Sequence, residues 1–191
     1  MPVTYTNRRG ATYILCKGTS KSGKPRYFFA REPKGEVVNA LPEGHQIEES
    51  VNGVVSLVKT RPQWIAPEEV ASVEAALQRH PQGRNYRVSA KQDQIIIYER
   101  QGPDIDALMA MFGRVGPPDP GVAERLNRAA SYIPVMRFIL NDRDSRAYIA
   151  QRWHFSGSID DWFDIGHAGP VATLARTLIP VLGTDAFFDL G

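Results

Sequence analysis

The sequence predicts an α+β protein, in which a small N-terminal antiparallel β region precedes an antiparallel sheet packed with helices. Short strand-like segments separated by turn residues fill residues 1–62, whereas helical periodicity first occurs after residue 67. Strand and helix signals do not alternate strictly after that point. Because a doubly wound parallel sheet needs such alternation, that architecture is not expected.

The first 62 residues are predicted to form about five short strands in a small sheet or barrel. Turn residues cluster at 7–10 and 17–23, and a further turn precedes a short strand at 42–44. Asn52-Gly53 predicts a type I′ hairpin turn, because both of its central residues must tolerate a positive φ. The clearest strand segments cover 12–16, 24–32 and 54–60.

The segment RPQWIAP, residues 61–67, predicts a joint between two regions. Its prolines restrict the backbone, and Trp64 between them is expected to pack against one side. We therefore divide the chain into a small β-rich basic region, residues 1–62, and an α+β region, residues 63–191.

The second region is predicted to begin with a helix over 68–80, with acids in its first turn and apolar residues at helical spacing. Ser158, a favourable N-cap residue followed by acids, predicts another helix over 159–166. The remaining expected elements are a hairpin over 85–100, a helix over 104–115, a linker over 116–121, a helix over 122–132, strands over 135–142 and 147–155 around a tight turn, a helix over 169–183, and a closing segment whose Phe187 and Phe188 pack onto the core.

Composition narrows the classes of protein. The 191 residues include 42% hydrophobic and 23% charged residues, as is usual for a globular protein with a core of its own. No apolar run approaches the about 18 residues that span a bilayer, and the first residues lack a signal-peptide core. We expect a cytoplasmic protein without a membrane partner. The single cysteine, Cys16, excludes an internal disulfide and a cysteine-rich zinc site.

Positive charge is concentrated near the N-terminus. The first 34 residues hold eight Lys and Arg and one acid, whereas residues 153–191 hold five Asp and one Arg. This asymmetry predicts a basic patch, which attracts nucleic acid or an acidic protein surface, although a basic patch can also be a merely solvated face.

The stretch Gly18–Lys24 matches G-x-x-x-x-G-K, the beginning of a nucleotide-binding loop. Pro25 follows where that loop needs Ser or Thr, and the next residues favour a strand over the helix that would face phosphate. We interpret the stretch as the tip of a basic hairpin that contacts a phosphate backbone and stacks its aromatics on bases; alternatively, the aromatics fill a core and the lysines keep an edge soluble. The residues assigned to nucleic-acid or partner binding are Arg8, Arg9, Lys17, Lys21, Lys24, Arg26 and Tyr27.

A catalytic site is an alternative. A hydrolase-like enzyme could use His154 with Asp160 or Asp161, which follow six and seven residues later. On a helix these acids and Asp164 would share one turn, which suits a metal or acid–base chemistry but is also where helices commonly carry acids. The four histidines show no metal-ligand spacing and no G-x-S-x-G motif occurs, so neither metal nor cofactor is expected.

Several motifs resemble those of a family of uncharacterised bacterial proteins of about 190 residues. They are a YTNRxG motif at 5–10, SGKPRYFF at 22–29, PEGxxI at 42–47 and GSIDDW at 157–162. The resemblance extends over most of the chain and implies no activity, cofactor or catalytic residue. The leading hypothesis is therefore a non-enzymatic binding module whose basic hairpin contacts nucleic acid or an acidic partner. A structural or assembly protein, with the C-terminal helix and Phe187–Phe188 as its oligomer surface, is the third alternative.

Overall fold

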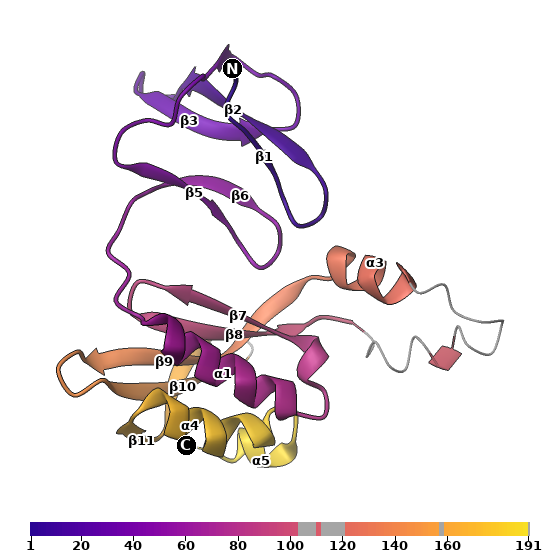
Figure 1. Ribbon diagram of the computed structural model, residues 1–191, viewed down its shortest axis with the longest axis vertical. Coiled ribbons are helices and arrows are strands. Elements are labelled where there is room, and N and C mark those ends of the chain that lie inside the picture. The colour runs from indigo at the N-terminus through magenta and orange to yellow at the C-terminus, as the bar shows by residue number, and fades with distance from the viewer. Residues whose placement is uncertain (103–109, 112–120, 157–158, 191) are drawn as a thin grey trace. The chain divides into compact units, whose positions relative to one another are not determined.

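The computed structural model describes residues 1–102, 110–111, 121–156 and 159–190 (Figure 1). The chain forms two compact units: unit 1 contains Met1–Arg61 and Pro118–Ala130, and unit 2 contains Pro62–Pro117 and Ser131–Gly191. Antiparallel sheets and helices confirm the predicted α+β class. The prediction that every residue after 62 lies in the second region was wrong for 121–130, because these residues make their contacts within unit 1.

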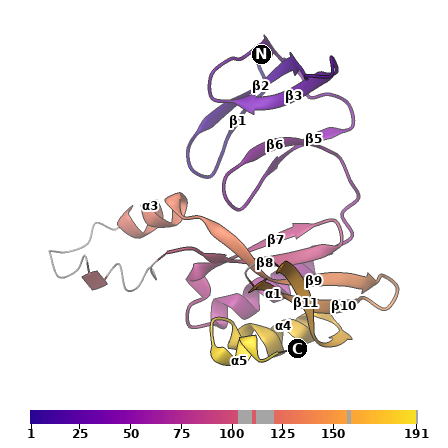
Figure 2. The ribbon, with the colours of Figure 1, turned by 180° about the vertical axis from the view of Figure 1, so that it is seen from behind.

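Unit 1 consists of two small antiparallel sheets and helix α3 (Gly121–Ala129), and its hairpins are seen from two sides in Figures 1 and 2. In the larger sheet β2 is central, pairing with β3 along one edge and with β1 and then β4 along the other. The strands are β1 (Thr4–Thr6), β2 (Thr12–Thr19), β3 (Pro25–Ala30), β4 (Glu36–Val37), β5 (His45–Glu49) and β6 (Val55–Lys59).

The turn between β5 and β6 differs from the predicted type I′ turn. Only Gly53 has a positive φ, of 73°, whereas Asn52 does not. The Gly53 N–H donates to the Ser50 carbonyl, and the Ser50 N–H donates to the Val54 carbonyl. These bonds close a three-residue loop that needs one left-handed residue instead of two.

Polar contacts around Asn7 connect the turns of unit 1. The Asn7 side chain is buried, and its Nδ2 donates to the Gly53 carbonyl at 2.6 Å. Its Oδ1 accepts from the N–H groups of Arg9 and Ala11 at 3.0 and 2.9 Å. The Tyr5 hydroxyl donates to Glu49 of β5 at 2.9 Å, so the two sheets are also joined by a side-chain hydrogen bond.

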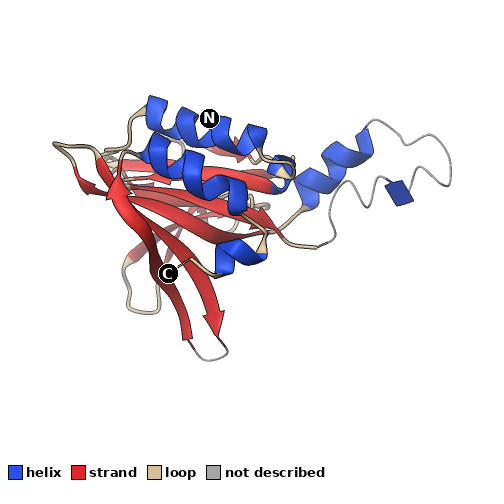
Figure 3. Cartoon of the chain, turned by 90° about the horizontal axis from the view of Figure 1, so that it is seen from below, coloured by secondary structure: helices blue, strands red, loops and turns tan. Residues whose placement is uncertain are grey.

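Unit 2 is a five-stranded antiparallel sheet in the order β11-β10-β9-β8-β7, with α1 and α4 packed on one face (Figure 3). Its core lies between that face and the helices, where Ile97, Met136 and Phe138 meet Val73 and Leu178. The elements are α1 (Pro67–Arg79), η1 (Gly83–Asn85), β7 (Tyr86–Lys91), β8 (Gln94–Arg100), β9 (Tyr132–Asp142), β10 (Ala147–Ser156), β11 (Ile159–Gly169), α4 (Val171–Leu178), η2 (Ile179–Val181) and α5 (Asp185–Phe188).

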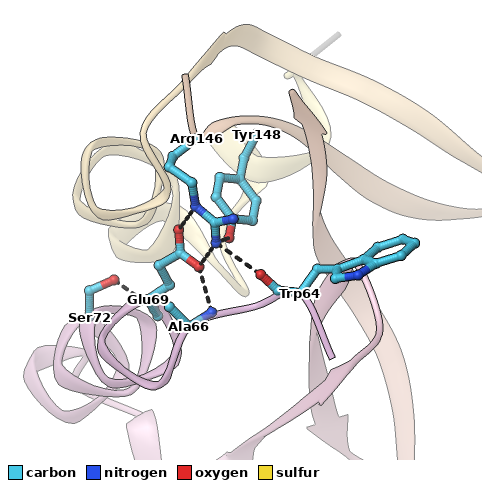
Figure 4. Close-up of polar contacts among 6 residues, drawn as sticks. All are labelled: Trp64, Ala66, Glu69, Ser72, Arg146 and Tyr148. Carbon is cyan, nitrogen blue, oxygen red and sulfur yellow. Dashed lines mark hydrogen bonds and ion pairs between the residues drawn. The ribbon is translucent and has the colours of Figure 1, made fainter. Parts of the chain in front are cut away.

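A buried carboxylate fixes the beginning of α1 to the β9–β10 turn (Figure 4). The Glu69 carboxylate accepts hydrogen bonds from the Arg146 guanidinium and from the N–H of Ala66, the residue immediately before α1. Burial alone would raise the pKa of Glu69, but hydrogen bonds from Arg146, Tyr148 and Ala66 hold it below the ordinary value. Arg146 also donates to the carbonyl of Trp64. The centroid of the Trp64 ring lies 3.1 Å from the Arg143 guanidinium carbon, but Trp64 is 38% exposed, so it packs less closely than predicted.

The largest correction concerns residues 159–166, which were predicted to be helical and instead belong to strand β11. β11 pairs with β10 from Ile159 to Gly169, with Trp162 opposite Trp153. Pairing with a neighbouring strand and burial of Ile165 outweigh the local helix-start signal.

Smaller corrections concern the ends of other elements. Tyr132, predicted to end a helix, begins β9, and Phe188 is 61% exposed whereas Phe187 is buried. The expected helix over 104–115 and the linker over 116–121 fall almost entirely outside the described residues. Within the residues described, no helix is long and apolar enough to cross a membrane.

Candidate functional site

The tip of the β2–β3 hairpin is a tight, internally bonded turn. The Ser20 N–H donates to the Lys24 carbonyl at 2.8 Å, and the Gly23 N–H donates to the Ser20 carbonyl at 2.9 Å. Gly23 has a φ of 78°, a conformation that costs glycine little and other residues more. The turn therefore holds its side chains on a defined backbone, and it is no phosphate loop, since β3 follows where a helix would be needed.

Three cations of this tip, Lys21, Lys24 and Arg26, are exposed. In the described part of the chain, no hydrogen bond or ion pair from another residue engages their side chains. Lys17 lies nearer the middle of β2 and forms an exposed ion pair with Glu36 at 3.6 Å. The three tip cations are therefore available to an external anion, whereas Lys17 is partly neutralised.

Arg8 and Arg9 do not belong to the same patch. They lie in the β1–β2 turn, at the opposite end of β2 from the tip. The eight residues of β2 separate the two turns by roughly 23 Å, at about 3.3 Å a residue. The Arg9 guanidinium donates to the Ala130 carbonyl just beyond α3, and the Arg8 N–H donates to Glu49. The residues assigned to binding therefore fall into two groups, because the strand between the turns keeps them apart.

The aromatic run of β3 is divided between the two faces of the sheet. Opposite residues of paired strands share a face, and Tyr27 pairs with Lys17, Phe28 with Cys16 and Phe29 with Leu15. Tyr27 and Phe29 thus share the face of buried Leu15, and Phe28 lies on the other face with its ring against Gly18. All three aromatics are half-buried. The expected stacking platform is therefore not a continuous exposed surface.

His154 in unit 2 lines a pocket of about 310 Å³ together with Glu99, Trp153 and Phe188. Arg152 Nη1 lies 3.4 Å from His154 Nδ1.

Asp161 is the Cα partner of His154 across β10 and β11, so the residues of the proposed catalytic pair are neighbours. The Asp161 carboxylate, however, accepts the N–H of Trp162 at 2.7 Å. In the parts of the chain that are described, no hydrogen bond joins Asp161 to His154. Asp160 is the Cα partner of Phe155, and its side chain lies outside the described residues.

Asp164 belongs to a polar chain on the helix-free face of the sheet. Arg137 Nε donates to Gln151, and Gln151 Nε2 donates to Asp164, both at 2.7 Å. The Arg137 guanidinium carbon lies 4.3 Å from the Trp162 ring centroid. Burial lowers the pKa of Arg137 despite the nearby carboxylates of Asp161, Asp164 and Asp93. Asp161 and Asp164 lie on β11, which is an edge strand of the sheet. Charged side chains protect a sheet edge from pairing with further strands, so these two acids have a structural role there.

Sequence reasoning missed Tyr86 and Glu99, which accompany His154 in the pocket. They are Cα partners in the β7–β8 hairpin, and a turn centred between residues 92 and 93 brings these two residues opposite each other. The predicted turn near 91–94 could therefore have indicated that Tyr86 and Glu99 lie opposite each other. The pocket itself was not predictable, because its walls come from strands and from the C-terminal segment.

Among residues 1–102, 110–111, 121–156 and 159–190, no group of three His, Cys, Asp or Glu side chains could hold a metal ion. Comparison of the chain with protein-family models, curated proteins and solved structures found no match. The resemblance to the bacterial family therefore stays a prediction.

Proposed function

We propose that the protein is a non-enzymatic binding module that contacts the phosphate backbone of nucleic acid through the tip of the β2–β3 hairpin. The observation that carries the proposal is the group of exposed cations Lys21 and Lys24, on one bonded turn, and Arg26, at the beginning of β3. Cations that already have carboxylate partners would lose those contacts on binding, whereas these three exchange only water and counterions.

The proposal favours recognition of the backbone over recognition of bases. Bases are read either by side chains that reach their edges or by aromatic rings that stack on them. Tyr27 and Phe29 are half-buried on the face of Leu15, so little ring surface is offered at the tip. We therefore expect similar affinities for double-stranded DNA of different sequences, and no large preference for single strands.

The test is fluorescence anisotropy with labelled DNA and RNA, single- and double-stranded, over a series of salt concentrations. The logarithm of the affinity for a B-DNA duplex should fall linearly with the logarithm of the salt concentration. Each lost phosphate contact should reduce the magnitude of this slope by about 0.9. The variant K21Q/K24Q/R26Q should therefore bind more weakly and have a slope smaller by about 2.7.

The matched control is K59Q/R61Q/R176Q, which removes the same number of exposed positive charges from other positions. If binding reflects only net charge, both variants will weaken equally, and the hairpin tip will have no special role. Absence of binding by the wild-type protein at low salt would reject the nucleic-acid proposal and direct the search to an acidic protein partner.

A further inference from the structure

The pocket around His154 lies within unit 2 and is independent of the hairpin tip. Most of its lining is apolar and aromatic, with Phe187 and Phe188 from α5, Ile133, Pro134 and Val135 from β9, and Trp153 from β10, whose ring lies against Trp162. The rings of Phe187 and Phe188 pack edge-on, with their centroids 5.8 Å apart. Phe187 is 4% exposed and Phe188 is 61% exposed. The volume, about 310 Å³, is at the lower end of the range for sites that hold small molecules, roughly 300–1,000 Å³.

One charged group lines these apolar walls. Glu99 accepts a hydrogen bond from the Tyr86 hydroxyl at 3.0 Å, through Oε1. Within the described chain no other side chain or N–H donates to this carboxylate, so its second oxygen is left for a ligand. The bond and the negative charge of Glu99, together with burial as the largest cause, raise the pKa of Tyr86, which stays a neutral donor.

No lysine or arginine side chain of the pocket wall balances Glu99. The lining residues include neither Lys nor Arg, although Arg152 Nη1 lies 3.4 Å from His154 Nδ1. Arg152 itself donates to the Leu190 carbonyl at 2.8 Å and does not line the pocket. A carboxylate beside aromatic rings can stabilise a bound cation through two interactions, an ion pair with the carboxylate and a cation–π contact with the ring faces.

We propose that this pocket binds a small organic amine, whose ammonium group donates to Glu99 and whose apolar body packs against Phe187 and Phe188. An anionic ligand of the same shape would bring a second negative charge beside Glu99. A neutral ligand would gain the apolar contacts without the ion pair. The order of affinity is therefore amine, then alcohol, then carboxylate.

Calorimetric titration of the full chain with 2-phenylethylamine, 2-phenylethanol and 3-phenylpropionate tests this order. The amine should bind about tenfold more tightly than the alcohol, as one charge-assisted hydrogen bond predicts. The carboxylate should bind more weakly than the alcohol. Equal affinities for the amine and the carboxylate, or no binding of the amine at millimolar concentration, would overturn the proposal.

Two variants locate the site. E99Q keeps an oxygen that can accept from Tyr86 but removes the charge, so it should erase the preference for the amine and leave the alcohol unaffected. F188A should lower the affinities for the amine and for the alcohol by the same factor, because the exposed ring contributes only apolar contact. The control E43Q removes an exposed carboxylate from unit 1 and should change nothing. An unchanged amine preference in E99Q would contradict the assignment to this pocket.

Discussion

The two units differ in what holds them together. Unit 2 has one apolar cluster to which every strand of its sheet and the helices α1 and α4 contribute. In unit 1 the buried hydrophobic residues are Leu15, Cys16 and Ala130, among the residues described. Unit 1 compensates with directed polar contacts around Asn7, Glu49 and Arg9.

The difference shows how a small unit can keep both stability and a charged surface. Apolar burial stabilises in proportion to area, and a unit as small as unit 1 has little interior to bury. Hydrogen bonds in turns then contribute a larger share of its stability. The exposed cations Lys21, Lys24 and Arg26 remain available for binding. Unit 1 should accordingly unfold before unit 2.

The largest expected effect is that of removing a ring from the core of unit 2. Phe138 is completely buried in β9, and F138A should lower the free energy of unfolding of unit 2 by about 3–5 kcal/mol. Calorimetry should show the later thermal transition moving down while the earlier one stays. A shift of both transitions by the same amount would show that the units unfold as one, and the comparison would fail.

In unit 1 the matching change is N7A, which removes three hydrogen bonds and leaves buried backbone groups unsatisfied. We expect a loss of about 2–3 kcal/mol from unit 1, since unpaired buried polar groups are costly. Hydrogen exchange should accelerate at residues 7–11 and 50–54 and remain slow in unit 2. The control N39A, at an exposed position, should leave exchange unchanged.

In unit 2 the contact between Glu69 and Arg146 depends on pH. The pKa of Glu69 is lower in the folded chain than its ordinary value of 4.5. Its contribution to stability is thus complete above the ordinary value and disappears as the pH falls through the lower, folded value. Denaturant titrations at pH 6 and pH 3 should show that E69Q loses about 1 kcal/mol less stability over this interval than the wild type. An identical loss in both proteins would exclude Glu69 as a source of acid sensitivity.

The smallest effect is expected at the ion pair of Lys17 with Glu36. Their side chains are 38% and 70% exposed, so K17Q should change the stability of unit 1 by no more than about 0.5 kcal/mol. Denaturant unfolding of K17Q and of E36Q measures the contribution. A loss as large as that of N7A would mean that surface charge, and not the Asn7 network, holds unit 1 together.

The hairpins could be predicted from the sequence because their signals are local. Turn residues at 7–10, 17–23 and 143–145 stand between segments of strand-forming residues, and the structure has hairpins at each, although β2 continues through Thr19 into the second of these segments. Helix α1 was predictable for the same reason, since periodic apolar residues and first-turn acids lie within one segment.

Strand β11 was not predictable, because its residues carry opposing signals. Acids after Ser158 favour a helix start, whereas Trp162 and Phe163 favour a strand, and the decision depends on pairing with β10. The same limit applies to the basic residues. Arg8 and Arg9 are close to Lys21 and Lys24 in the sequence. Strand β2 lies between the two pairs of residues and places them at opposite ends of a sheet.

The most direct test of the binding surface is an amide chemical-shift titration of the labelled full chain with a short DNA duplex at low salt. The account predicts shifts concentrated at residues 19–27, with smaller changes along β2 and none on the helix-free face formed by β9 to β11. Shifts centred on the Arg137–Trp162 chain of unit 2, with residues 19–27 unaffected, would contradict the assignment of nucleic-acid binding to the hairpin tip.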